Sequence, residues 1–111
     1  MGRGVVISRK KGVAIMWIRL IEMMIQPGKL EEMRKIYNEQ IVPAVKAQKG
    51  NIDVYLMESL DRENQVISFT SWEKQQHGDD YEASGAYVQN FNRVKHTFSG
   101  MPTLWSYEVK R

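Results

Sequence analysis

Residues Ser71–Tyr87 read SWEKQQHGDDYEASGAY, and this stretch contains the transition that decides the fold. The pair Trp72-Glu73 closes a short β-rich run, and a polar turn follows it. Tyr81-x-x-Ser84-x-x-Tyr87 then opens an amphipathic helix. The segment therefore joins the rim of a sheet to the start of a helix, where a small α/β domain most often builds a pocket.

The spacing of apolar residues on either side predicts a β-α-β-β-α-β order. Trp17–Ile25 alternates as a strand, and Pro27-Gly28 marks the turn that ends it. Helical spacing begins at Leu30, and Pro43 is expected to kink or end the regular helix near Ile41–Val42. The remaining expected elements are strands over Ile52–Glu58, Gln65–Trp72 and Thr103–Val109, and a helical region over Lys74–Phe98 interrupted at Ser84-Gly85.

This order predicts an α+β fold, the ferredoxin-like βαββαβ arrangement with a four-stranded antiparallel sheet. Two helices can cover only one face of such a sheet. The first strand nevertheless carries apolar residues on both faces, with Trp17 and Ile21 on one and Ile18 and Leu20 on the other. A bare apolar face of that size needs a partner, so we expect a homodimer in which two sheets pack face to face.

Length and composition indicate one domain, preceded by a basic segment. Arg3, Arg9, Lys10 and Lys11 lie within the first fifteen residues, which contain no acidic residue. Without them the net charge of +3 becomes −1, with 12 basic against 13 acidic residues, so a nucleic-acid partner is not expected. We interpret residues 1–15 as a disordered basic extension, a cloning remnant or the product of an upstream start, and residues 16–111 as the domain.

Several classes of protein are disfavoured by what the sequence lacks. It contains no cysteine, which excludes disulfides and thiolate chemistry and fits a cytoplasmic protein. No signal peptide or membrane-spanning segment is expected, so we predict no membrane partner. No glycine-rich phosphate loop or other cofactor motif is present, and no cofactor is expected.

A metal site at His77, Asp79 and Asp80 is an alternative that the spacing does not favour. These residues follow one another as in a polar turn, and His96 lies nineteen positions further along the chain. A solvated helix start, with acidic residues near its positive end, explains the same pattern. We therefore predict no metal site.

The aromatic residues allow two interpretations. Core packing explains Phe91, Val94 and Phe98, which share one helical stripe. Trp72 and Tyr81 each carry a polar group and lie beside the predicted strand–helix junction, so they are also candidates for a pocket. Spacing alone does not separate the two possibilities for this pair.

The sequence resembles the antibiotic biosynthesis monooxygenase (ABM) family of small dimeric α+β-barrel proteins. Pro27-Gly28 matches the turn after the first strand, and Trp72-Glu73 matches the end of another. Tyr81-x-x-Ser84-x-x-Tyr87 matches a His-x-x-Ser-x-x-aromatic motif, with Tyr81 in the His position. Residues Ile41–Val45 also resemble the first helix of the quinol-oxidising members. The resemblance covers Met16–Val109.

This resemblance implies oxidation of a small electron-rich aromatic, a quinol or a polyketide-type phenol, by O₂ without metal or flavin. Tyr81 is then the candidate catalytic residue, through proton transfer or hydrogen bonding to the substrate. Trp72, Tyr87, Ser68 and Asn90 are the candidate substrate-pocket residues. Ser68 stands where polyketide-anthrone oxygenases carry Asn, and Gly78 where they carry Tyr.

Two alternatives remain open beside catalysis on an aromatic. The first is a non-catalytic dimeric module that binds a ligand or serves a stress response. The second is haem binding and degradation, which another branch of the family performs with an Asn–Trp–His set. Tyr81 occupies the Trp position of that set and Asn90 the His position, so haem degradation is disfavoured.

Overall fold

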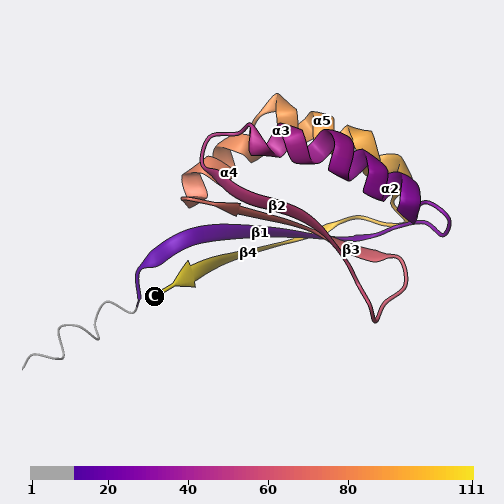
Figure 1. The fold of residues 1–111 in the computed structure, drawn as a ribbon, viewed down its shortest axis with the longest axis horizontal. Coiled ribbons are helices and arrows are strands. Elements are labelled where there is room, and N and C mark those ends of the chain that lie inside the picture. Colours follow the sequence, from indigo (N-terminus) through magenta and orange to yellow (C-terminus); the bar gives the residue numbers. More distant parts are fainter. Residues whose placement is uncertain (1–11) are drawn as a thin grey trace, which may run out of the picture.

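Four antiparallel strands form one sheet in the order β2-β3-β1-β4, with helices on one of its faces (Figure 1). The computed structural model describes residues 12–111. The strands are β1 (Ala14–Met24), β2 (Asn51–Glu58), β3 (Gln65–Trp72) and β4 (Thr103–Lys110). The helical segments are α2 (Leu30–Ile36), η1 (Tyr37–Ile41), α3 (Val42–Lys46), α4 (Gln75–Glu82), α5 (Gly85–Val94) and η2 (Lys95–Thr97). The predicted α+β, ferredoxin-like fold is confirmed.

The central strand β1 begins slightly earlier than the sequence predicts. Its first residue is Ala14, three positions before the predicted start at Trp17, and the backbone of Val13 exchanges hydrogen bonds with that of Arg111. Residues 13–15 thus belong to the pairing with β4. Residues 1–11 of the predicted basic extension lie outside the described residues.

The first helical layer contains a widened turn just ahead of Pro43. In η1 the N–H of Val42 donates to the C=O of Tyr37, five residues back, which is π-helical geometry. Pro43 has no N–H, and its ring crowds the carbonyl four residues earlier, so a wider turn accommodates it. The predicted irregularity is therefore present: it spans Tyr37–Ile41, and the helix continues beyond it to Lys46.

The predicted helical region after β3 is present with its interruption at Ser84-Gly85, and it includes the polar stretch before Tyr81, whose composition also indicates a turn. This stretch forms α4, which places Tyr81 in the last turn of this helix instead of at the start of α5. Ser84 precedes α5, and its hydroxyl donates to the C=O of Tyr81 at 2.6 Å. Gly78 lies in α4 against the ring of Trp17, where a Cβ would come within 2.2 Å of Cζ3. This glycine therefore allows α4 to pack closely against Trp17. The sequence alone does not indicate this role, because a glycine among polar residues is typical of a turn.

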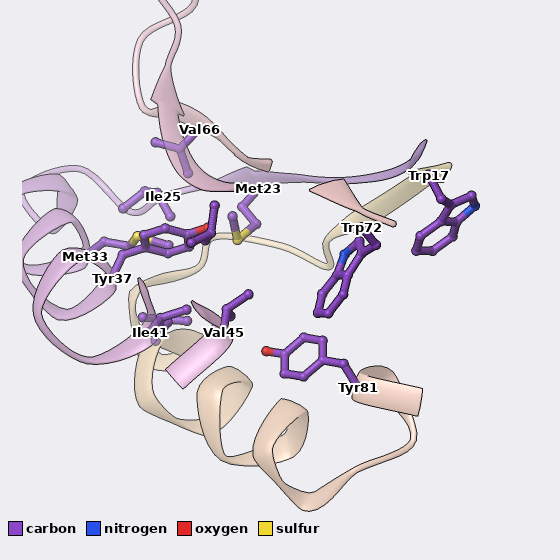
Figure 2. Close-up of a cluster of buried hydrophobic side chains, with 12 residues drawn as sticks. Trp17, Met23, Ile25, Met33, Tyr37, Ile41, Val45, Val66, Trp72 and Tyr81 are labelled. Carbon is purple, nitrogen blue, oxygen red and sulfur yellow. The ribbon is translucent and has the colours of Figure 1, made fainter. Parts of the chain in front are cut away.

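The core lies between the sheet and the helices, and Figure 2 shows how its largest side chains meet there. Met33 and Val45 come from the helical layer, and Ile25, Val66 and Trp72 from the sheet side; each is at most 2% exposed. Burial of each such side chain contributes about 1.5–3 kcal/mol to folding. Within residues 12–111 no helix is long and apolar enough to cross a membrane.

Within residues 12–111 no helix covers the other face of the sheet, which we call the outer face (Figure 1). Register pairs Leu20 with Trp105 and Ile18 with Tyr107 on this face. Trp105 remains 49% exposed and Tyr107 52% exposed. Two half-exposed aromatic side chains beside aliphatic ones form an apolar surface of the kind that binds a partner, and a homodimer through this face stays a prediction.

Candidate functional site

A cavity of about 210 Å³ lies between the inner face of the sheet and the helical layer. Most of its wall is apolar, and the helices contribute Met33, Ile41 and Val45 from one side and Phe91 and Val94 from the other. The polar groups in the wall are few and come from separate elements. They are Arg19, Tyr37, Ser68, Thr70, Tyr81, Glu82, Tyr87 and Asn90.

Tyr81, the predicted catalytic residue, presents its hydroxyl to this cavity and is only 8% exposed. Asn90 donates from Nδ2 to the Tyr81 hydroxyl oxygen at 2.7 Å, and Arg93 in turn donates to Oδ1 of Asn90. Because Asn90 is the donor, the phenolic proton of Tyr81 remains available for a ligand. Burial raises the pKa of Tyr81, and the Asn90 hydrogen bond only partly opposes that shift. Tyr81 is therefore a neutral hydrogen-bond donor at physiological pH.

The other aromatic candidates hold Tyr81 in place from two sides. Trp72 stacks on its ring at 5.5 Å between centroids, and Tyr87 meets it edge-on at 5.5 Å. Trp72 is 1% exposed and donates from Nε1 to the Thr70 hydroxyl at 2.9 Å. Trp72 therefore backs Tyr81 from the sheet side and is not part of the cavity wall, whereas Tyr87 is.

The structure brings four of the five predicted residues to one cavity: Ser68, Tyr81, Tyr87 and Asn90. Ser68 and Tyr81 lie on different elements, β3 and α4, while Tyr87 and Asn90 both belong to α5. Their placement is consistent with a common site, and their chemical roles remain predictions.

Tyr37 is a polar group of the cavity that the sequence interpretation did not single out. Its hydroxyl lies 2.7 Å from Oγ of Ser68 and donates to the C=O of Tyr55 at 3.2 Å. Burial raises its pKa well above the usual range of tyrosine, so it is also neutral. In the sequence Tyr37 sits within a helical stripe of apolar residues, and nothing in that spacing separates a pocket tyrosine from a core tyrosine.

An ion pair between Arg19 and Glu82 also lines the cavity. Arg19 donates from Nε and Nη2 to the two carboxylate oxygens of Glu82 at 2.7 and 3.0 Å, and its guanidinium lies 5.0 Å from the centre of the Trp17 ring. The two side chains are 17% and 21% exposed. Arg19 is the one basic residue in the largely apolar strand β1, and this was the signal in the sequence that could have pointed to it.

The candidate metal residues of the polar stretch are not gathered into a site. His77 packs against Gly50, and Asp80 accepts a hydrogen bond from Gln76 at 2.8 Å. Neither His77 nor Asp79 nor Asp80 lines the cavity. Across residues 12–111, no group of three or more His, Asp or Glu side chains is arranged to hold a metal ion.

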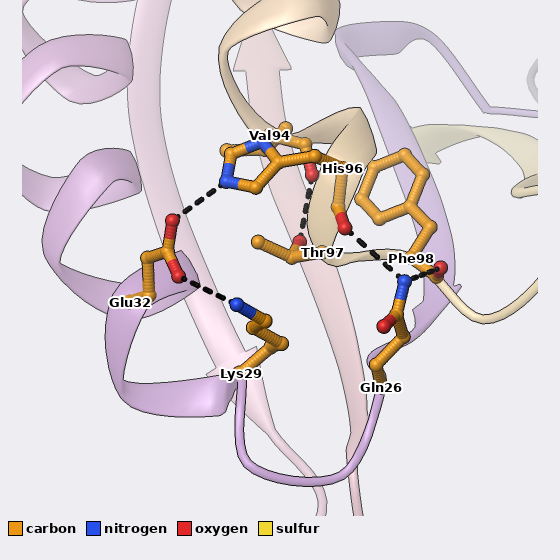
Figure 3. A network of polar contacts seen from close by, with 7 residues as sticks. All are labelled: Gln26, Lys29, Glu32, Val94, His96, Thr97 and Phe98. Atoms are coloured by element: carbon orange, nitrogen blue, oxygen red, sulfur yellow. Dashed lines mark hydrogen bonds and ion pairs between the residues drawn. The ribbon is translucent and has the colours of Figure 1, made fainter.

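A polar network fixes the end of the cavity that Val94 and Phe98 line (Figure 3). Gln26 donates from Nε2 to the C=O groups of His96 and Phe98, at 3.1 and 2.9 Å. His96 contacts Glu32 of α2 through Nε2 at 2.6 Å, and Lys29 lies 3.6 Å from the same carboxylate. These contacts tie η2 to the turn after β1 and to α2.

Residues 16–94 match the sequence model of the antibiotic biosynthesis monooxygenase family. The chain belongs to this family. No curated protein matches the chain in sequence.

Solved structures agree with this assignment at the level of the fold. A Caulobacter crescentus CB15 protein classed provisionally as an antibiotic biosynthesis monooxygenase superposes with a TM-score of 0.77 at 12% identity, covering 94% of this chain and 98% of its own. A variant of SnoaB, a cofactor-independent oxygenase from Streptomyces nogalater, gives 0.75 at 9% identity, with coverages of 88% and 96%. A conserved protein from Methanosarcina mazei Go1 gives 0.74 at 16% identity, with coverages of 86% and 95%.

Proposed function

We propose that this member of the ABM family is a monooxygenase that oxidises a small electron-rich aromatic, a quinol or polyketide-type phenol, with O₂. The observation that carries the proposal is the state of Tyr81. Its hydroxyl accepts from Asn90, keeps its own proton, and faces an apolar cavity. A buried donor in an apolar enclosure is suited to orient one oxygen atom of an aromatic substrate.

The chemistry requires no external reductant if the substrate supplies the electrons. A quinol C–H becomes C–OH as the ring is oxidised to the quinone level, or a ring CH₂ becomes C=O. In both cases one atom of O₂ enters the product and the other leaves as water. The protein then contributes orientation, a hydrogen bond to a substrate oxygen, and exclusion of water from the reacting intermediate.

In this proposal two polar positions in the cavity bind the oxygen atoms of the substrate. Tyr81, fixed by Asn90 and stacked on Trp72, donates to one substrate oxygen. Tyr37 and Ser68 form a second polar position in the same cavity. The apolar wall between them contacts the ring.

We further propose that the protein is a homodimer joined through the outer face. Exposed aromatic residues on β4, with apolar neighbours on β1, support a partner of the same kind. Two such faces can pack as in a β-sandwich, at about 10 Å between sheets.

Oxygen uptake tests the proposed activity. Quinols and anthrones are presented in turn to the wild type, to Tyr81→Phe and to Tyr107→Phe, which removes a hydroxyl from the outer face as a matched control. Loss of one positioned proton donor is expected to lower kcat/KM about 10²–10⁴-fold in Tyr81→Phe. Tyr107→Phe should match the wild type. Absence of turnover on every substrate by the wild type contradicts the proposal.

A ligand-binding module without catalysis is the second candidate. It is favoured by the raised pKa values of Tyr37 and Tyr81, because neither hydroxyl can accept a proton from a phenol at neutral pH. Native mass spectrometry separates the two functions. A retained small molecule, together with no oxygen uptake, supports the module.

A further inference from the structure

We infer that the Arg19–Glu82 ion pair selects uncharged aromatic ligands for the cavity and excludes carboxylated ones. This inference deepens the proposed function, on which it rests for the ligand cavity, and it names a specificity-determining pair. Both side chains belong to the cavity wall, one from the centre of the sheet and one from the end of α4.

The ion pair presents no net charge to a ligand. The guanidinium uses both Nε and Nη2 on the two oxygens of one carboxylate, which is the bidentate arrangement that Arg and carboxylate favour. Trp17 packs below the guanidinium. A neutral ligand can contact this wall without disturbing either charge.

A carboxylated ligand meets a different situation. Its carboxylate could take the bidentate position on Arg19 only by displacing Glu82, and the displaced carboxylate would remain in a wall that is largely shielded from water. With the pair intact, the ligand carries its charge into a largely apolar cavity, where the neutral pair offers no net positive charge to offset the lost hydration. Either outcome disfavours the anion, so the cavity prefers the uncharged form of a ligand of the same shape.

A second ion pair in the same chain provides a matched comparison. Arg34 of α2 donates from Nε and Nη2 to Glu58 of β2, at 2.5 and 2.8 Å, with the same bidentate geometry. The side chains of Arg34 and Glu58 are 44% and 32% exposed, more than those of the first pair, and neither lines the cavity. If the Arg19–Glu82 pair served only to hold a helix on the sheet, as the Arg34–Glu58 pair does, neutralising Glu82 would change ligand affinity no more than neutralising Glu58.

The experiment compares two probes of one shape, 2-naphthamide and 2-naphthoate, by isothermal titration calorimetry. Wild type is expected to bind the amide more tightly. Glu82→Gln frees the guanidinium, so the ratio of the two dissociation constants should shift toward naphthoate by about ten- to a hundredfold, the range of a charged hydrogen bond. The double variant with Arg19→Gln should lose that gain, and Glu58→Gln should keep the wild-type ratio.

Any one of three results overturns the inference. In the first, the wild type binds naphthoate as tightly as naphthamide, and in the second it binds neither probe. In the third, the ratio of the two dissociation constants is the same for Glu82→Gln as for the wild type. The first two need no variant, so the inference can be rejected even if Glu82→Gln does not fold. Because the readout is binding, it is independent of oxygen uptake. A protein that selects the amide yet oxidises nothing rejects the monooxygenase proposal alone.

Discussion

Replacing Gly78 by Ala tests the packing that brings α4 onto the sheet and so positions Tyr81. A Cβ at this position would lie 2.2 Å from Cζ3 and 2.7 Å from Cε3 of Trp17. Carbon atoms in good contact are about 3.5–4.0 Å apart, so the overlap exceeds 1 Å. Trp17 is 4% exposed and has the Arg19 guanidinium against its ring, which leaves it little room to move.

The expected change in the free energy of unfolding of Gly78→Ala follows from two opposing effects. Ala in place of Gly favours a helix interior by about 1 kcal/mol. Overpacking costs about 1–3 kcal/mol and sometimes more, and an overlap with a buried indole belongs at the upper end of that range. The expected net loss in the free energy of unfolding is about 1–2 kcal/mol, which corresponds to a fall in Tm of roughly 5–15 °C for a domain of this size.

Thermal unfolding followed by circular dichroism, at one fixed protomer concentration, measures this change. Gly85→Ala is the matched control, because Gly85 opens α5 and no atom lies within 4 Å of its Cβ position. It should be neutral or mildly stabilising. If Gly78→Ala is as stable as Gly85→Ala, the close approach of α4 to Trp17 is not a constraint and the reasoning fails.

Two further predictions concern the His96 network and the outer face. The pKa of Glu32 is lowered chiefly by its hydrogen bond to His96, so its stabilising effect is present above the ordinary carboxylate pKa and is lost as pH falls below about 4. The free-energy difference between wild type and Glu32→Gln should therefore shrink toward acid pH, and a difference that is independent of pH contradicts this. Trp105→Lys should shift the light-scattering mass from dimer to monomer while the fold survives, whereas Leu60→Lys, at a residue 99% exposed, should not. A wild-type monomer rejects the dimer.

The sequence predicted the sheet and its order well because period-two alternation survives wherever one face of a strand is buried. The bounds of β3 agree fully with expectation, since a Trp-Glu pair and a polar turn mark its two ends. The helical region after β3 was predicted together with its interruption at Ser84-Gly85, but the polar turn expected before Tyr81 is part of α4. The composition of α4 is that of a loop, and its single glycine makes sense only once Trp17 is known to lie against it.

The candidate site was predictable only in part, for a physical reason. Tyr81, Tyr87 and Asn90 lie on consecutive helices, and their spacing brings them together locally. Tyr37 reaches the same cavity from a helix more than thirty residues earlier, and Arg19 from the central strand. Contacts between residues so far apart in the sequence depend on tertiary packing, and the local spacing of residues does not predict them.

The π turn over Tyr37–Ile41 has a consequence for how this chain tolerates changes in length. A π turn is in effect an α-helix with one residue inserted, and each residue of an α-helix advances the side chain by about 100°. Deleting a single residue here would restore a regular α-helix. Because the wide turn already absorbs that extra residue, the flanking segments Leu30–Ile36 and Val42–Lys46 would keep their orientation relative to one another. A one-codon deletion at this point would therefore disturb the helix less than a deletion within α2 or α3, which would turn the side chains on one side of it by about 100°.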